Sequence, residues 1–371
     1  MKDTERHTMA QEHTKQHVRM ASTTEAKRGN LRTDNANGQG KRKRNSSVEL
    51  LRFFFMAGIL LIHIYGFGIS PYPYHIFELG RSPETCIHLA LNCLGQMGVT
   101  GFVFISGYYG IRINRRKIML LVLTTIFYAV IIELTLNTHM TLKTGLSLLH
   151  AFDLLWFMSC YIMLCLVSPV IEAGVKSIGR HAFRNVVIGI IIYVYGAHLL
   201  GFYNDHNFLL LLSVYLIARY TSLYPPTFLI RHTKAVIAAG LFFTAAVPVI
   251  FSMCGTSCSP IMGLAATNNN IALLALSAGC IIEAERHSTH IPVVNYFSSS
   301  ILSIYLITSN SLVCQPLMQY LYPTLLKGYG FALVIACCLF CLLIDKVRIF
   351  IFDIVALTAQ RLCGRFNSNS K

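Results

Sequence analysis

Two ionisable residues in the first apolar segment are the strongest candidates for chemistry. Arg52 and His63 lie eleven positions apart in this segment. In an α-helix that spacing is about three turns plus roughly 20°, so both side chains leave one face, separated by roughly 16 Å along the axis. Glu49 precedes Arg52 by three positions, close enough for its carboxylate to pair with the guanidinium. Ionisable groups are costly inside apolar segments, so each one is a candidate functional residue.

A guanidinium at the membrane surface and an imidazole deeper in a helix bundle suit a long substrate with two different ends. A guanidinium binds phosphate through paired hydrogen bonds, and a neutral imidazole accepts a proton from a hydroxyl group. An acyl-CoA carries phosphates at one end and a thioester at the other, so Arg52 and His63 suit acyl transfer. The alternative is that Arg52 reaches to the lipid headgroups while His63 bonds a neighbouring helix.

The elements that position these residues are apolar segments. Hydrophobic residues make up 54% of the chain and charged residues 13%, whereas a soluble domain has roughly 25% charged residues. A spanning helix needs about 20 mostly apolar residues. Ten segments qualify: 47–69, 87–110, 117–137, 150–171, 184–203, 206–223, 234–253, 260–283, 294–318 and 329–351. We therefore predict an all-α polytopic membrane helix bundle of about ten transmembrane helices. The short sixth segment and the polar eighth are the weakest of the ten.

The distribution of basic residues predicts the orientation. If the basic first 46 residues are cytoplasmic and the segments alternate, sixteen later Lys and Arg fall on the cytoplasmic sides and three on the outer sides. This asymmetry is typical of a positive-inside topology and predicts two cytoplasmic termini in contact with a lipid bilayer. It also accounts for the net charge of +15, and since no recognition motif for DNA or RNA is present, we expect no nucleic-acid partner.

This assignment of membrane spans divides the chain into three regions. Residues 1–46 are polar and without apolar periodicity, which predicts a disordered cytoplasmic arm. Residues 47–352 form the transmembrane domain, and 353–371 a basic cytoplasmic tail. Most of the twelve cysteines lie inside apolar segments, and no Cys or His spacing indicates zinc, so we expect no metal.

Further motifs accompany the Arg52 and His63 pair. They are FVFISGYY at 102–109 followed by Arg112, LWFMSCY at 155–161 with Ser168 and Pro169, YLIARY at 215–220, and IYLI at 304–307. Together these motifs resemble the acyltransferase-3 family of membrane O-acyltransferases, which modify bacterial polysaccharides, lipopolysaccharide and other glycans. The resemblance covers about residues 45–350.

The resemblance implies a donor and an acceptor. The donor is an acyl-CoA, usually acetyl-CoA, that approaches from the cytoplasm, and the acceptor is a lipid-linked or surface glycan at the bacterial inner membrane. By this resemblance His63 is the catalytic base, Arg52 contacts the donor or holds the site together, and Arg112 assists with the donor phosphate. Arg115 is a further phosphate-binding candidate, although a plain topology signal explains it as well.

Supporting residues are expected around this site. They are Glu49, Ser106, Trp156, Asn270 and Asn310. Trp156, the only tryptophan, is either an aromatic anchor at the membrane interface or a stacking platform for a sugar. Asn270 ends a run of three asparagines that lines a cavity or caps a helix break, because such residues are costly in lipid.

One position departs from the family pattern, and two other functions remain open. Many relatives have a histidine after the IYLI motif, where this chain has Thr308, Ser309 and Asn310. A transporter or flippase for a glycolipid or small solute would use Arg52 and His63 in recognition or proton coupling. A non-catalytic component of capsule or exopolysaccharide assembly is the other alternative.

Overall fold

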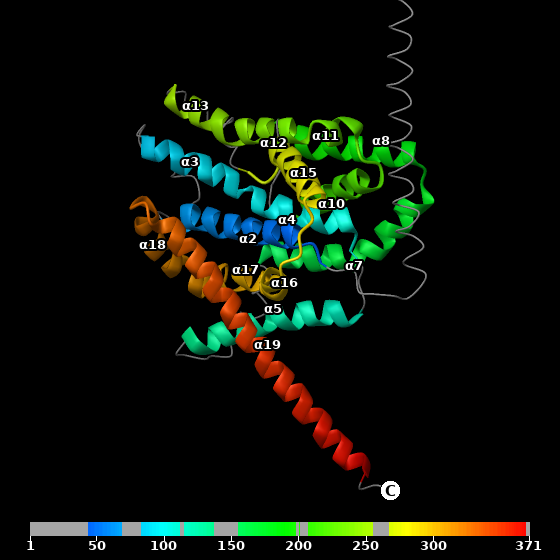
Figure 1. Ribbon diagram of the computed structural model, residues 1–371, viewed down its shortest axis with the longest axis vertical. Helices are drawn as coiled ribbons and strands as arrows, with labels where there is room; N and C mark the ends of the chain where they lie inside the picture. The colour runs from blue at the N-terminus through cyan, green and yellow to red at the C-terminus, as the bar shows by residue number, and fades with distance from the viewer. Residues whose placement is uncertain are drawn as a thin grey trace, which may run out of the picture. The chain divides into compact units, whose positions relative to one another are not determined.

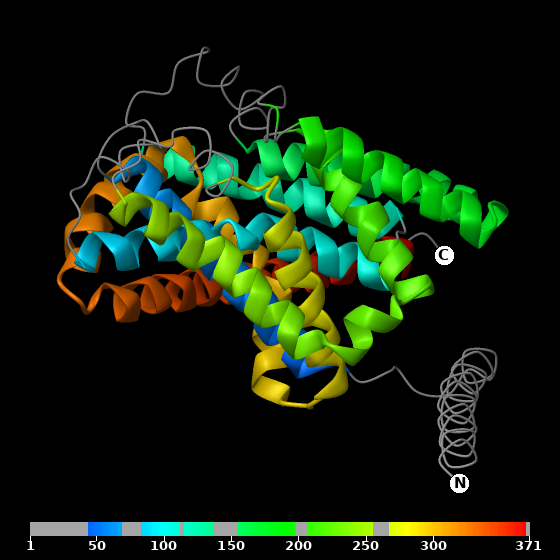
Figure 2. The same ribbon diagram turned by 90° about the horizontal axis from the view of Figure 1, so that it is seen from above.

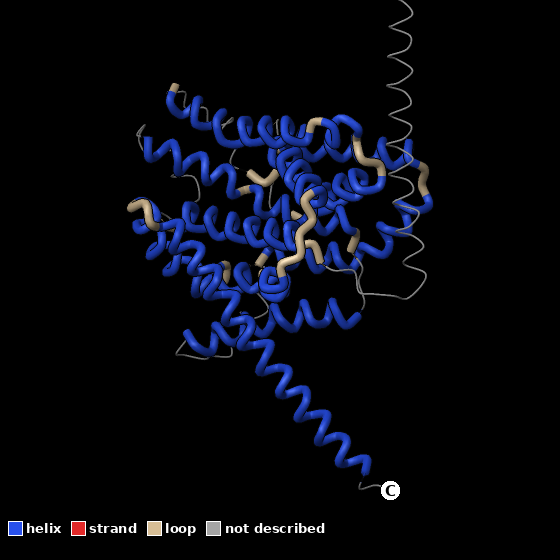
Figure 3. Tube along the Cα trace, viewed as in Figure 1, coloured by secondary structure: helices blue, strands red, loops and turns tan. Residues whose placement is uncertain are grey.

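The computed structural model describes residues 44–68, 83–111, 115–136, 155–197, 200, 207–254 and 267–368. Its helices are α2 (Ser46–Phe67), α3 (Pro83–Gly95), α4 (Met97–Tyr109), α5 (Arg115–Leu136), α7 (Trp156–Ser177), α8 (Arg180–Ile191), η2 (Ile192–Gly196), α10 (Phe208–Leu223), α11 (Thr227–Arg231), α12 (Thr233–Leu241), η3 (Phe242–Ala246), α13 (Val247–Met253), α15 (Ile271–Arg286), α16 (Pro292–Phe297), η4 (Ser298–Ser300), α17 (Leu302–Thr308), α18 (Ser311–Leu326) and α19 (Gly330–Ser368). The described residues contain no strand (Figure 3), so the expected all-α class is confirmed for them.

In the described part of the chain, six helices are long and apolar enough to cross a membrane. They are Ser46–Phe67, Cys86–Tyr109, Arg115–Leu136, Trp156–Ser177, Thr233–Met253 and Gly330–Ile354. A seventh span results if the bent pair Pro292–Thr308 and Leu312–Leu325 is counted as one. The expected number of about ten is therefore not confirmed. The fifth, sixth and eighth predicted segments correspond to the shorter helices α8 with η2, α10 and α15.

Two of the predicted spans are interrupted, each at an asparagine that caps the following helix. The Asn270 side chain accepts a hydrogen bond from Ala272 N at 2.8 Å, so α15 begins only after the asparagine run. The Asn310 side chain accepts from Leu312 N at 3.0 Å, where the chain bends by 92° between α17 and α18. Asparagine is a favoured N-cap because its oxygen satisfies an otherwise unpaired backbone N–H. The sequence pattern predicted a cap or a cavity for Asn270, and the structure has the cap.

The start of α2 is anchored to the end of α15, which is distant in sequence. The Asn45 side chain caps α2 by accepting from Ser47 N, and its amide donates to Ala284 O at 3.1 Å. Ser46 N donates to Thr289 O at 2.9 Å. These bonds fix the start of α2, whose first two turns carry Glu49 and Arg52.

Small residues allow α2 and α4 to pack closely. A Cβ atom at Gly98 would lie 2.5 Å from Phe55 O, and one at Gly101 would lie 2.5 Å from the Phe55 ring. In membrane bundles glycine at a helix interface allows the two backbones to approach. Figures 1 and 2 show the helices packed side by side, with α2 and α4 between α12 and α13 at one edge and α5 with α19 at the other. The two central helices therefore pack closely against each other.

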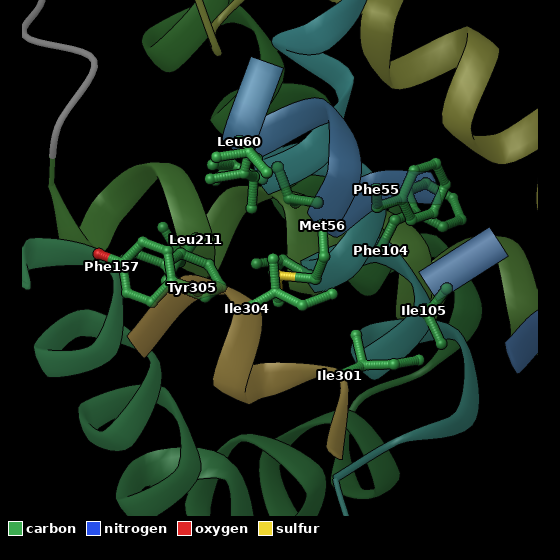
Figure 4. Packing of buried hydrophobic residues seen from close by; sticks show 14 of the residues in the cluster. Phe55, Met56, Leu60, Phe104, Ile105, Phe157, Leu211, Ile301, Ile304 and Tyr305 are labelled. Atoms are coloured by element: carbon green, nitrogen blue, oxygen red, sulfur yellow. The ribbon is translucent and has the colours of Figure 1, made fainter. Parts of the chain in front are cut away.

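One part of the buried core lies where α2, α7 and α17 meet. Met56 and Leu60 of α2 are completely buried and belong to one cluster with Phe157, Ile304 and Tyr305. Figure 4 shows Met56 directed toward Ile304. By contrast, the spanning windows of α5 and of α12 with α13 are only 22% and 17% buried. Those helices therefore expose apolar side chains on the outside, as lipid-facing helices do.

Candidate active site

The Arg52 and His63 side chains project from the interior-facing stripe of α2. Met56 and Leu60 stand between them on this stripe, and both have 0% of their surface exposed. Residues three, four, seven, eight and eleven positions apart share one helix face. Both ionisable groups therefore face the bundle, each half-buried, instead of the surrounding lipid.

Arg52 forms an ion pair with Glu49 at the start of α2. Its Nη1 donates to both carboxylate oxygens at 3.0 Å, and the side chains of Arg52 and Glu49 are 31% and 8% exposed. The pair fixes the direction of the guanidinium. Within the described part of the chain the remaining guanidinium N–H groups have no hydrogen-bond partner.

Two tyrosines interact with Arg52 electrostatically. The guanidinium acts electrostatically on the hydroxyls of Tyr109 in α4 and Tyr161 in α7. Tyr109 donates a hydrogen bond to Glu285 near the end of α15, and Ser106 bonds Tyr161 at 3.1 Å. This end of the site thus brings together four helices, α2, α4, α7 and α15, around one half-exposed cation.

His63 lies near the other end of α2, four residues before Phe67. Its Nδ1 is 3.3 Å from the Ser309 hydroxyl, which lies at the bend between α17 and α18. The imidazole also packs against Tyr305, with ring centroids 6.4 Å apart, and against Phe67 at 5.9 Å. The sequence pattern placed Ser309 beside a family motif but did not predict this contact.

A row of aromatic rings connects the two ends. Tyr161 stacks on Phe157 with centroids 5.8 Å apart, and Phe157 meets Tyr305 edge-on at 5.4 Å. Met56 and Leu60 face this row and are completely buried (Figure 4). The direct line from Arg52 to His63 is therefore filled by apolar side chains, and a long ligand that joins the two groups must displace some of them.

The other basic candidates, Arg112 and Arg115, follow α4 in the sequence. Arg115 is the first residue of α5 and is exposed to its surroundings. Arg112 lies outside the described residues.

Trp156 begins α7, half-buried, and packs edge-on against Phe157 with centroids 6.1 Å apart. It therefore packs against Phe157, a ring that contacts both Tyr161 and Tyr305.

A second ion pair, which the sequence did not predict, lies next to Gly110 in the turn that follows α4. Arg219 of α10 donates to Glu172 of α7 at 2.7 Å, and Tyr215 donates to the other oxygen of the same carboxylate at 2.8 Å. Tyr215 also accepts from Ile111 N at 3.3 Å, next to Gly110 at φ +72°. The YLIARY motif contained Tyr215 and Arg219, but nothing near it indicated a partner in α7.

Two of the asparagines before α15 are buried. Asn268 and Asn269 are 3% and 2% exposed, and both side-chain polar atoms of Asn269 lack a hydrogen-bond partner among the described residues. Thr100 of α4 donates to the Asn268 carbonyl at 3.2 Å. Asn270, the residue after Asn269, caps α15 through Ala272 N at 2.8 Å.

The comparison with known families agrees with the motifs. The described residues contain no group of three or more His, Cys, Asp or Glu side chains that would hold a metal ion. No curated protein and no solved structure matches the chain. The acyltransferase domain that defines the acyltransferase-3 family matches residues 45–346, most of the chain and nearly all of the helical bundle. The chain belongs to the acyltransferase-3 family and is a membrane acyltransferase.

Proposed function

We propose that this protein transfers an acyl group, in particular acetyl, from an acyl-CoA to a hydroxyl of a lipid-linked or surface glycan. The observation that carries the proposal is the interior stripe of α2, which holds a guanidinium near one end and an imidazole near the other. The two groups are separated by roughly 16 Å of helix. Such a separation suits a donor whose anionic and reactive ends are joined by a long arm.

Arg52 supplies the donor contact in this proposal. Glu49 engages Nη1 and leaves Nη2 and Nε to bind a phosphate, since a guanidinium carries five donors in a planar fork. Arg115 lies exposed at the start of α5 and adds positive charge for the donor. Arg112, two positions after Gly110, is proposed for the same task.

His63 is the proposed general base. The acceptor hydroxyl transfers its proton to the imidazole nitrogen that carries no hydrogen as its oxygen attacks the thioester carbonyl carbon. The C–S bond then breaks, the sulfur leaves as a thiolate, and the imidazolium returns the proton to it. The products are an acyl ester of the acceptor and the free thiol of CoA, so the step needs neither a metal nor a redox partner.

The donor arm is proposed to lie along the aromatic row. Tyr161, Phe157 and Tyr305 form one continuous wall between the guanidinium end and the imidazole end of the site. Met56, which faces this wall, is unbranched and flexible, so it can move aside at low cost. The donor arm would contact the aromatic wall in place of Met56. The free-energy cost of displacing Met56 would therefore be small.

The bacterial inner membrane is the proposed location, with both termini in the cytoplasm. Support comes from the excess of Lys and Arg on alternate sides of the predicted segments. In this orientation Arg52 lies toward the cytoplasm, where acyl-CoA is present, and His63 lies toward the opposite side. An acceptor that reaches His63 from the bend at Ser309 would then be bound from the outer half of the membrane.

The test is turnover of radiolabelled acetyl-CoA by the purified full chain in detergent. We expect slow loss of the thioester by transfer or hydrolysis in the wild type and no measurable turnover for His63→Gln. His88→Gln is the matched control, because His88 is a buried imidazole of α3 that bonds Tyr65 at 2.8 Å and is not part of the proposed site. Equal thioester loss by wild type and His63→Gln would contradict the proposal. Glycolipid movement without thioester loss would instead favour a flippase.

A further inference from the structure

We infer that Ser309 is a positioning residue that orients the His63 imidazole, so that Nε2 is the nitrogen that accepts the acceptor proton. The inference rests on the proposed function of His63. Its basis is the contact of 3.3 Å between the Ser309 hydroxyl and His63 Nδ1, which joins residues 246 positions apart. Both side chains are half-buried, so this contact competes little with bulk water.

The backbone at the bend fixes the position of the Ser309 hydroxyl. Ser309 ends α17, and its N–H donates to Tyr305 O at 2.9 Å. The next residue, Asn310, caps α18 through Leu312 N. The serine is thus held between the last turn of one helix and the first turn of another, across a bend of 92°. A hydroxyl placed by two helix ends has little freedom to leave the imidazole.

The neighbouring hydroxyl has a different partner. Thr308 is 1% exposed, and its Oγ1 donates to Ile304 O at 2.7 Å within its own helix. Of these two adjacent residues, Ser309 is therefore the one whose hydroxyl faces α2. Tyr305, one turn earlier, places its ring beside the same imidazole. The bend thus presents a hydroxyl and an aromatic face to His63 together.

A hydroxyl suits this position because it can accept a hydrogen bond throughout the reaction. When Nδ1 carries the hydrogen and donates to Ser309, Nε2 is the unprotonated nitrogen and acts as the base. After Nε2 takes the acceptor proton, both ring nitrogens are donors, and Nδ1 still donates to the same oxygen. Ser309 therefore stabilises the protonated imidazole as well as the reactive tautomer, in the way that a third group orients the base in other catalytic sites.

The experiment compares Ser309→Val with Ser309→Thr in the full chain, using acetyl-CoA turnover in detergent. Valine and threonine have nearly the same shape, but only threonine keeps the hydroxyl. Ser309→Val should lower kcat roughly tenfold, the effect of losing one hydrogen bond to a group that becomes charged. The KM for acetyl-CoA should stay within about twofold, because the Arg52 end is untouched. Ser309→Thr should recover most of kcat.

Controls separate the hydroxyl from packing. Thr308→Val removes the adjacent hydroxyl and should leave kcat within about twofold of wild type, since that group bonds its own helix. If Ser309→Val does not fold, Ser309→Ala measures the same loss without added bulk. Equal kcat values for the valine and threonine variants, whether high or low, would overturn the inference. Turnover that survives His63→Gln would overturn the proposed function itself, whatever the Ser309 variants show.

Discussion

Replacing Gly110 by alanine tests how the turn after α4 is held. Gly110 has φ +72°, and a Cβ atom there would lie 3.2 Å from Arg219 Cζ and 3.4 Å from Glu172 Oε1. Gly328 has φ +83° with no atom within 4 Å of its added Cβ. Both glycines occupy the left-handed region that L-residues avoid. Of the two glycines, only Gly110 would bring an added Cβ atom against an ion pair.

The expected losses of stability can be separated with this pair. Left-handed backbone costs a non-glycine residue about 1–2 kcal/mol, which is the whole expected effect of Gly328→Ala. Gly110→Ala should lose this amount and a further ~1–3 kcal/mol. The addition arises because the new methyl group pushes the guanidinium of Arg219 away from Glu172, and hydrogen bonds to charged groups contribute about that much.

The assay is reversible unfolding of the purified protein in mixed micelles of SDS and a mild detergent, with both variants measured beside the wild type. Turnover adds a second readout, because Gly110 directly precedes the basic segment proposed to assist the donor. The KM for acetyl-CoA should rise in Gly110→Ala and stay unchanged in Gly328→Ala. Equal losses of stability would refute the reasoning, since the Glu172 and Arg219 pair would then tolerate the added methyl group.

Three further predictions concern other contacts. Arg52→Lys keeps the charge but loses the planar fork, so the KM for acetyl-CoA should rise about tenfold with a smaller change in kcat; an unchanged KM in steady-state kinetics would exclude the donor contact. Gly101→Ala should reduce the free energy of unfolding by about 1–3 kcal/mol through overpacking against Phe55, and a compensating Phe55→Leu should restore part of the loss. Asp345→Asn should cost about 3 kcal/mol in the same unfolding assay, because it leaves Arg348, 12% exposed, without its anionic partner; near-wild-type stability would contradict this.

The membrane class and the interior stripe of α2 could be predicted because they depend on local patterns. Long apolar runs predict helices, and the eleven-residue spacing places Arg52 and His63 on one face whatever surrounds them. The ion pair between Glu49 and Arg52 follows from the same periodicity and is present at 3.0 Å. These features need no knowledge of how the helices pack.

The remaining features depend on tertiary packing and could not be predicted from the sequence. Hydropathy does not distinguish a straight span from one that bends at Ser309, or a full span from a helix that begins at Ile271. The partners of His63 and Arg219 are supplied by helices distant in sequence. Asn310, which follows the apolar residues 304–307 after Thr308 and Ser309, is a favoured helix cap and is a local sign of the bend.

The central claim is that one donor molecule reaches from Arg52 to His63 inside the bundle. Two photoreactive analogues of acyl-CoA test it most directly, one with a diazirine on the acyl group and one with an azide on the adenine. After irradiation and peptide mapping, the acyl label should attach near His63, on α2 or at the bend around Ser309. The adenine label should attach near Arg52, on the ends of α2, α4 or α5. Labelling by both analogues at the same end, or by the acyl analogue only outside the bundle, would contradict the account.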